Sequence, residues 1–193
     1  MKSLNVMIVG VGGQGTLLAS RVLGAAMQAA GQDVKVSEVH GMSQRGGSVV
    51  TYVRAGEKVY SPIINPGEAD LILAFEQLEA ARWLPYLKKE GMLIVNTQKM
   101  DPMPVVTGAA QYPEGVLEAL RKAGARLQAV DALKLAMEAG SVKAVNIVLI
   151  GVMARQTDIP KEVSQDAERT TVQGGLYVYI IYIEKKIKFY YKN

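Results

Sequence analysis

The sequence contains no cysteine and only one histidine, His40, among its 193 residues. Without a thiolate, the chain cannot form disulfides, ligate an iron–sulfur cluster or use a cysteine nucleophile. A single imidazole also argues against a histidine-rich zinc or iron site, and we expect no metal site. Any such redox centre in the activity of this protein must therefore belong to another chain.

Long hydrophobic runs and concentrated charge are missing as well. No apolar stretch reaches the ~20 residues needed to cross a membrane, and the first residues lack the pattern of a signal peptide. We therefore expect a cytoplasmic protein without a membrane partner. The net charge is only +4, from 22 basic and 18 acidic residues that are intermixed. A nucleic-acid-binding domain more typically has a basic stripe with interleaved aromatics, so no nucleic-acid partner is expected.

What the chain does have is enough apolar sequence for one well-filled core. Hydrophobic residues make up 49% of it, and a chain of this length normally forms one domain. Strand patterns alternate with helical patterns, which predicts an α/β fold with three layers, a mostly parallel sheet and helices on both faces. We place this domain at residues 1–163. Residues 164–193 form an atypical tail rich in Tyr, Ile and Lys.

Two local patterns make specific predictions about the sheet. A strand predicted at residues 34–39 follows the first strand and its helix, and this order is typical of a parallel pair with a right-handed crossover. A helix is predicted from Glu76 to Lys89, closed by Gly91, with a buried strand at residues 92–96 after it.

A glycine cluster separates the first predicted strand, at residues 6–9, from the helical pattern that begins at Thr16. Glycine permits positive φ angles and close backbone approach, and the unpaired N–H groups at a helix start favour an anion. The spacing predicts a Rossmann-like strand–loop–helix unit. Its candidate cofactor-binding residues are Gly10, Gly12, Gly13, Gln14 and Gly15. A turn that only lets the helix pack closely on the sheet is the other interpretation of the same glycines.

Glu38 lies about twenty residues beyond Gly15, near the end of the second predicted strand. In a dinucleotide-binding protein an acid at this distance holds the ribose hydroxyls, which favours a nicotinamide or flavin site. A solvated or ion-paired glutamate fits the same position equally well, so both interpretations stay open.

A second glycine-punctuated segment, residues 40–48, reads His-Gly-Met-Ser-Gln-Arg-Gly-Gly-Ser and predicts a functional loop on a rigid sheet. Arg45 suits a fork-like contact with phosphate or carboxylate, and adjacent glycines can turn their N–H groups toward an anion. The further candidate cofactor-binding residues are Ser43, Gln44, Arg45, Gly46 and Gly47. His40 is a candidate catalytic residue without an assigned role, because no nucleophile or carboxylate obviously pairs with it.

These two motifs, followed downstream by Asp-Leu-Ile-Leu-Ala-Phe-Glu at residues 70–76, closely resemble the gamma-type subunit of 2-oxoacid:ferredoxin oxidoreductases. Within that family, the form His-Gly-Met-Ser-Gln-Arg-Gly-Gly is most similar to the indolepyruvate ferredoxin oxidoreductases. The resemblance covers roughly residues 1–163, and the tail departs from the family pattern.

The resemblance implies the small subunit of an enzyme, inactive without its large subunit. The partner would hold thiamine diphosphate and iron–sulfur clusters, and this chain alone would bind no cofactor. The implied reaction is oxidative decarboxylation of an aryl 2-oxoacid such as indolepyruvate, with the acyl group passed to coenzyme A and electrons to ferredoxin. Both glycine motifs would then lie at the subunit interface near the active site, in contact with coenzyme A or substrate.

Two other classes of function are consistent with the residues. A stand-alone NAD-binding dehydrogenase would place Glu38 on the ribose, although no Lys/His/Tyr constellation for hydride transfer is evident. A non-catalytic protein would bind a nucleotide at the glycine loop for regulation or assembly. Both alternatives predict ligand binding by the single chain, whereas the resemblance predicts activity only with a partner.

Arg45 provides the first test. If its guanidinium binds the oxoacid carboxylate or a coenzyme A phosphate, Arg45→Ala should raise the Michaelis constant for that compound by roughly tenfold or more, equivalent to ~1.4 kcal/mol. Steady-state kinetics of the assembled enzyme, with each substrate varied in turn, measure this change. Unchanged constants for both compounds would eliminate the role.

Overall fold

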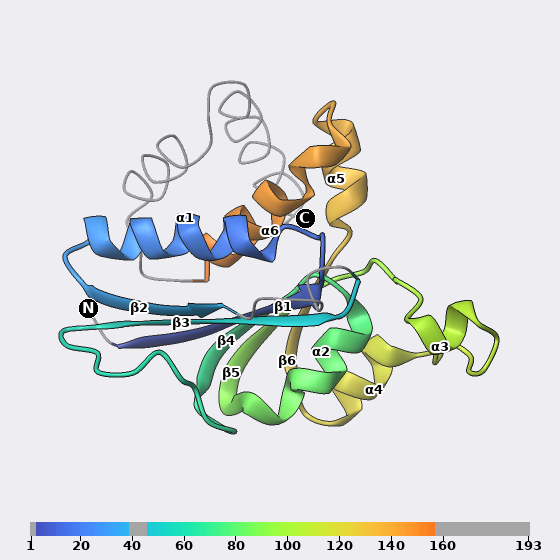
Figure 1. The fold of residues 1–193 in the computed structure, drawn as a ribbon, viewed down its shortest axis with the longest axis horizontal. Coiled ribbons are helices and arrows are strands. Elements are labelled where there is room, and N and C mark those ends of the chain that lie inside the picture. Colours follow the sequence, from blue (N-terminus) through green and yellow to red (C-terminus); the bar gives the residue numbers. More distant parts are fainter. Residues whose placement is uncertain (1–2, 39–45, 157–193) are drawn as a thin grey trace.

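The computed structural model describes residues 3–38 and 46–156, which fold around a six-stranded sheet (Figure 1). Its strands are β1 (Leu4–Val11), β2 (Asp33–Glu38), β3 (Ser48–Gly56), β4 (Ala69–Ala74), β5 (Leu87–Asn96) and β6 (Arg126–Val130). They lie in the order β2-β3-β1-β4-β5-β6. Strands β1, β4, β5 and β6 form successive parallel pairs.

Helices cover both faces of this sheet. They are α1 (Thr16–Ala29), α2 (Gln77–Trp83), α3 (Met103–Val106), α4 (Val116–Lys122), α5 (Ala132–Glu138) and α6 (Val145–Ala154), with 3-10 turns η2 (Leu84–Tyr86) and η3 (Val142–Ala144). Buried residues of α1, α5 and α6 share one core cluster, and those of α2 and α4 share the other. The predicted three-layer α/β fold with a mostly parallel sheet is therefore confirmed (Figure 1).

The central strands are buried on both faces. In β1, Val6 and Ile8 belong to the cluster with α1, while Met7 and Val9 belong to the cluster with α2 and α4. All four side chains are fully buried. A strand covered in this way has no polar side, which explains why β1 is a continuous apolar run rather than an alternating one.

The predicted parallel pair between the first two strands is wrong. β2 forms at residues 33–38, but it pairs with β3 in antiparallel register, and β3 in turn pairs with β1. Burial explains why β3 takes the inner position: its Val53 and Ala55 are fully covered, whereas Lys35 and Val36 of β2 are exposed. A strand that is half exposed is better placed at the edge of the sheet.

The helix predicted from Glu76 to Lys89 is too long. Helix α2 ends at Trp83, and β5 begins at Leu87 after the 3-10 turn η2. Pro85 explains the early end, because proline cannot donate a backbone hydrogen bond and its ring clashes with the preceding helical turn.

Gly91 does not close a helix but lies inside β5. A Cβ atom at this position would come within 2.7 Å of Leu87 Cδ1 and 3.0 Å of the Ala69 carbonyl oxygen. The glycine therefore permits close packing between β5 and β4, next to the register shift that separates the pairings of Ala69 and Leu71. Gly91 is needed for the short distance between β5 and its neighbours, not to end a helix.

Several predictions from the sequence fall on the undescribed ranges. The boundary at residue 163, the tail at residues 164–193 and the segment 39–45 all lie outside the described residues. Within residues 3–38 and 46–156, no helix combines the length and apolar character required to span a bilayer.

Asn96 provides a test of how the strand ends are joined. Its buried amide donates to the Phe75 carbonyl oxygen (3.2 Å) and accepts from the Ala132 N–H (3.3 Å). Asn96→Ala leaves the Ala132 N–H without this acceptor, so the free energy of unfolding should fall by ~1–3 kcal/mol. Urea denaturation measures the change. The exposed amide Gln111 is the matched control, and Gln111→Ala should change stability by less than ~0.5 kcal/mol. Equal losses in both variants would contradict the proposed contribution of Asn96.

Candidate functional site

The glycine loop connects β1 to α1 as predicted. Gly15 is the N-cap of α1 with φ 85°, and Gly13 has φ 99°. Both values lie in the left-handed region that side chains disfavour. The strand–loop–helix unit expected from the glycine spacing is thus present, and it lies at the carboxyl end of β1.

Two of the glycines allow close packing. A Cβ atom on Gly10 would lie 2.8 Å from Gln14 Oε1 and 3.0 Å from Phe75 Cβ. On Gly15 it would collide with the side-chain amide of Asn146, which α6 brings against the loop. The packing interpretation of the motif therefore holds for Gly10 and Gly15. Gly13 differs, because it is exposed and nothing lies within 4 Å of its position for a Cβ atom.

Gln14 braces the loop from inside. Its Oε1 accepts from the Val11 N–H (2.8 Å), and its Nε2 donates to the Phe75 carbonyl oxygen (3.2 Å). Both ends of this amide are thus engaged within the protein. Gln14 fixes the loop relative to the end of β4, and Gly13 is the exposed residue of the loop.

The second motif meets the first through its described end. The Gly12 N–H donates to the Gly47 carbonyl oxygen (2.9 Å), and Gly46 has φ 89°. Ser48, which begins β3, donates its hydroxyl hydrogen bond to the buried carboxylate of Glu79. The candidates His40, Ser43, Gln44 and Arg45 lie outside the described residues. The structure thus brings Gly12 and Gly47 together, although their motifs are separated in the sequence.

Glu38, at the end of β2, lies beside the glycine loop. Its Oε1 accepts a hydrogen bond from the buried hydroxyl of Ser20 (3.0 Å). Together with Gly12, Gly13, Gly15, Thr16, Leu17, Val49 and Thr51, it lines a cleft of about 260 Å³. Glu38 is therefore near the loop, as a ribose-binding acid would be, but β3 separates its strand from β1.

A larger cleft of about 590 Å³ opens on the opposite side of the loop. Its walls come from the glycine loop, the ends of β4 and β5, and the α5–α6 region. The lining residues are Gly12, Gly13, Gln14, Phe75, Gln98, Met100, Leu133, Val142, Val145 and Asn146. The crossover from β1 runs over one face of the sheet and that from β4 over the other, so this cleft lies at a topological switch point, where open α/β sheets commonly bind ligands.

Two buried acids next to these clefts were not predicted as site residues. Glu76 caps α2 by accepting from the Glu79 N–H (3.1 Å), and it also accepts from the Met100 N–H (3.3 Å) and the Tyr112 hydroxyl. Burial and this hydrogen bond to Glu76 raise the pKa of Tyr112 far above its usual range. The signal available in the sequence was an acid two residues after an apolar strand, at the start of the predicted helix.

Glu79 is the second of these acids. Besides Ser48, its carboxylate accepts from Trp83 Nε1 (3.3 Å) and Arg82 Nε (3.1 Å). Every one of these contacts joins α2 to itself or to the start of β3. Within the described ranges, no group of three or more acidic or histidine side chains is arranged to hold a metal ion. Glu76 and Glu79 therefore position the segments that border the clefts.

The fold and the clefts define an open α/β protein with a glycine loop and two candidate ligand clefts at the carboxyl edge of its sheet. Its sequence matches the pyruvate ferredoxin/flavodoxin oxidoreductase family over residues 5–179. The chain belongs to this family.

Individual relatives agree with this assignment. The chain is 46% identical to the indolepyruvate oxidoreductase subunit IorB of Thermococcus kodakarensis, over 87% of this chain and 85% of the relative. It is also 46% identical to the IorB subunit of Pyrococcus horikoshii, over 83% and 81%. Its fold is similar to 2-oxoglutarate:ferredoxin oxidoreductase from Magnetococcus marinus, with a TM-score of 0.73 at 19% identity, covering 100% of this chain and 31% of that one.

Gly13 and Gly15 form a matched pair for testing the loop. Gly13→Ala should cost ~1–2 kcal/mol of unfolding free energy from its positive φ alone. Gly15→Ala should cost ~1–3 kcal/mol more, because its methyl group also collides with Asn146. Adding Asn146→Ala should recover most of that excess in Gly15→Ala and none of the loss in Gly13→Ala. Denaturant unfolding of five variants, with Asn146→Ala alone included, measures the coupling, and an absence of recovery would contradict the contact.

Proposed function

We propose that this chain is the small subunit of an indolepyruvate (aryl 2-oxoacid):ferredoxin oxidoreductase. The observation that carries the proposal is the 46% identity to two chains named as IorB subunits, over more than four-fifths of each chain. In the proposed reaction, the 2-oxoacid and coenzyme A give acyl-CoA and CO₂. The two electrons released pass to ferredoxin.

The proposal divides the chemistry between two chains. This chain has no cysteine, so thiolate-ligated iron–sulfur clusters must lie on the large subunit. We place thiamine diphosphate there as well; when bound, it supplies the carbanion stabilisation needed for decarboxylation. The complex would be cytoplasmic, and its remaining partners are ferredoxin and the small-molecule 2-oxoacid.

The contribution of this chain would come from its carboxyl edge. The two glycine motifs are joined by the hydrogen bond from Gly12 to Gly47, and the exposed Gly13 borders both clefts. We propose that these motifs, with Arg45, contact coenzyme A or the 2-oxoacid. The coenzyme A and succinyl-CoA reported with the Magnetococcus enzyme are consistent with a coenzyme A substrate.

A stand-alone NAD-binding dehydrogenase is less well supported. In the dinucleotide-binding fold the second strand lies directly beside the first, so its terminal acid reaches the ribose. Here β3 lies between them, and Ser20 already binds one oxygen of Glu38. Family membership and strand order therefore both favour the oxidoreductase subunit.

Mixing the two subunits tests the proposal. This chain and the large subunit encoded beside it should co-purify, and anaerobic reduction of ferredoxin should require both chains, indolepyruvate and coenzyme A. Omitting any one of the four should reduce the rate to background. Pyruvate in place of indolepyruvate is the substrate control and should give a much lower kcat/KM.

Two results would contradict parts of this proposal. If the two chains form no complex and the single chain binds NAD in a calorimetric titration, the subunit assignment fails in favour of a dinucleotide-binding protein. If the complex forms but prefers pyruvate, the subunit assignment stands and the aryl substrate is wrong.

A further inference from the structure

A segment with unusual surface chemistry lies between β5 and α4. Residues 102–111, which we call the arm, read Pro-Met-Pro-Val-Val-Thr-Gly-Ala-Ala-Gln and contain no charged side chain, although 21% of the whole chain is charged. Eight of the ten arm residues are exposed, and the other two are partly exposed. Met103 and Val106 are 67% and 65% exposed. Exposed apolar sequence without charge is characteristic of surfaces that another molecule covers.

The arm is ordered by its own hydrogen bonds. The Val105 and Val106 N–H groups both donate to the Pro102 carbonyl oxygen (2.8 and 3.1 Å), and the Thr107 N–H donates to that of Met103 (2.9 Å). Ala110 closes the turn through its N–H bond to the Pro104 carbonyl oxygen (2.9 Å). Because these bonds already hold the backbone, docking of the arm would lose less conformational entropy than docking of an unstructured loop.

Both ends of the arm are attached to one buried carboxylate. Glu76 Oε1 accepts from the Met100 N–H, two residues before the arm, and from the Tyr112 hydroxyl, directly after it. Lys99 adds a cation–π contact, with Nζ 5.3 Å from the centre of the Tyr112 ring. Met100 and Tyr112, which form the base of the arm, are thus fixed to α2 by Glu76, while α3 projects away from the sheet (Figure 1).

The location of the arm identifies the side from which a partner would approach. Met100, at the base, forms part of the wall of the 590 Å³ cleft, together with the exposed Val142. The base of the arm therefore lies at the edge of the candidate site, and the exposed Asp101 separates Met100 from the uncharged arm. If the proposed function holds, the redox groups belong to a larger subunit, and that subunit must reach this same edge.

We infer that the arm is a docking element that inserts its Met103–Val106 turn into an apolar groove of the large oxidoreductase subunit and so fixes that subunit over the carboxyl-edge cleft. This inference rests on the proposed function. The base held by Glu76 keeps the arm in register with the cleft, and the uncharged surface of the arm avoids the cost of burying unpaired charges.

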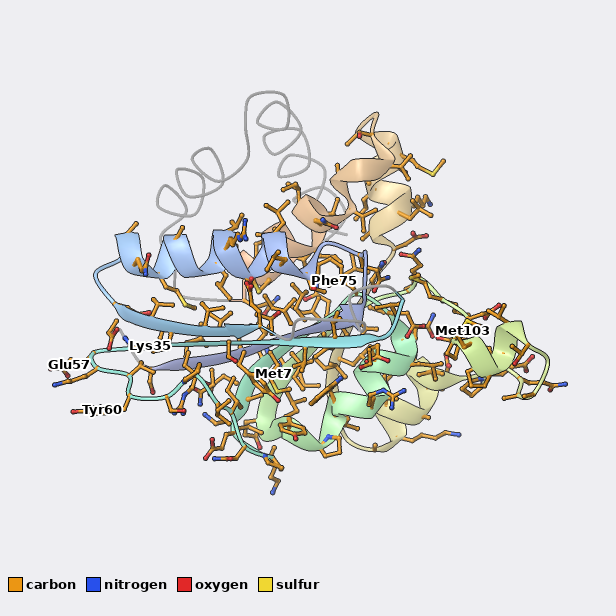
Figure 2. All side chains as sticks on the ribbon, in the orientation of Figure 1. Met7, Lys35, Glu57, Tyr60, Phe75 and Met103 are labelled. Atoms are coloured by element: carbon orange, nitrogen blue, oxygen red, sulfur yellow. The ribbon has the colours of Figure 1, made fainter. Side chains whose placement is uncertain are left out.

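Photo-crosslinking in the co-expressed complex tests this inference. A p-benzoylphenylalanine residue at position 103 should give, on irradiation, one product with the summed mass of the small and large subunits. The matched control is the same substitution at Tyr60, which is 84% exposed and lies at the opposite end of the molecule (Figure 2). The control should give at least about tenfold less of that product, because an exposed side chain outside an interface core has no fixed neighbour to capture.

A charge substitution gives an independent measurement. Met103→Glu combined with Val106→Glu should raise the dissociation constant of the two subunits by about 100-fold or more, because both carboxylates would be buried without partners. Tyr60→Glu should change it by less than about threefold. Met103→Leu should leave the dissociation constant nearly unchanged. Thermal unfolding of each purified variant is the control for retention of the fold.

The outcomes separate the two proposals. If the unsubstituted chains form no complex, the proposed function fails and the arm has no such partner. If an active complex forms but position 103 gives no product with the large subunit, or links two copies of this chain instead, the docking inference alone is overturned. Unchanged affinity in the double glutamate variant would overturn it as well.

Discussion

The backbone of Phe75 joins the strand ends on which the candidate site is built. Its N–H continues the sheet by donating to the Val9 carbonyl oxygen (2.9 Å), and its own carbonyl oxygen accepts from Gln14 and Asn96 (3.2 Å each). The backbone N–H and C=O of this one residue thus connect the carboxyl ends of β1, β4 and β5. Phe75 and Asn96 are each only 1% exposed, so these polar groups have no access to bulk water as an alternative partner. Because each of these buried polar groups needs its hydrogen-bond partner, the strand ends at the carboxyl edge of the sheet are held in one arrangement.

The glycines of the first motif have different roles: some allow close packing, and one leaves its backbone exposed. Gly10 and Gly15 leave room for Phe75 and for Asn146, so that the first helix and α6 can approach the strand ends. Gly12 binds the second motif through Gly47, and Gly13 remains exposed beside both clefts. The packing interpretation is therefore correct for two glycines. The exposed backbone of Gly13 is what we propose to present to coenzyme A or the 2-oxoacid, while Gly12 holds the two motifs together.

The two buried acids hold the segments that border the candidate site. Glu76 and Glu79 have their carboxylates occupied by backbone, hydroxyl, indole and guanidinium donors. Each holds a border of the site, at the base of the arm and at the start of β3 respectively. A chain that positions loops with its buried acids and contains no cysteine is suited to completing an active site whose reactive groups lie on a second subunit.

The sequence by itself determined the α/β class, the strand–loop–helix at the glycine cluster and the family, because these depend on periodicity and residue types within short segments. Only the tertiary structure decided that β3 lies between β2 and β1, that Gly12 meets Gly47, and that Glu76 attaches both ends of the arm. The physical reason is that strand order follows from how completely each strand can be buried in the assembled sheet. Hydrogen bonds between distant segments likewise form only after the layers have packed, so local patterns carry no record of them.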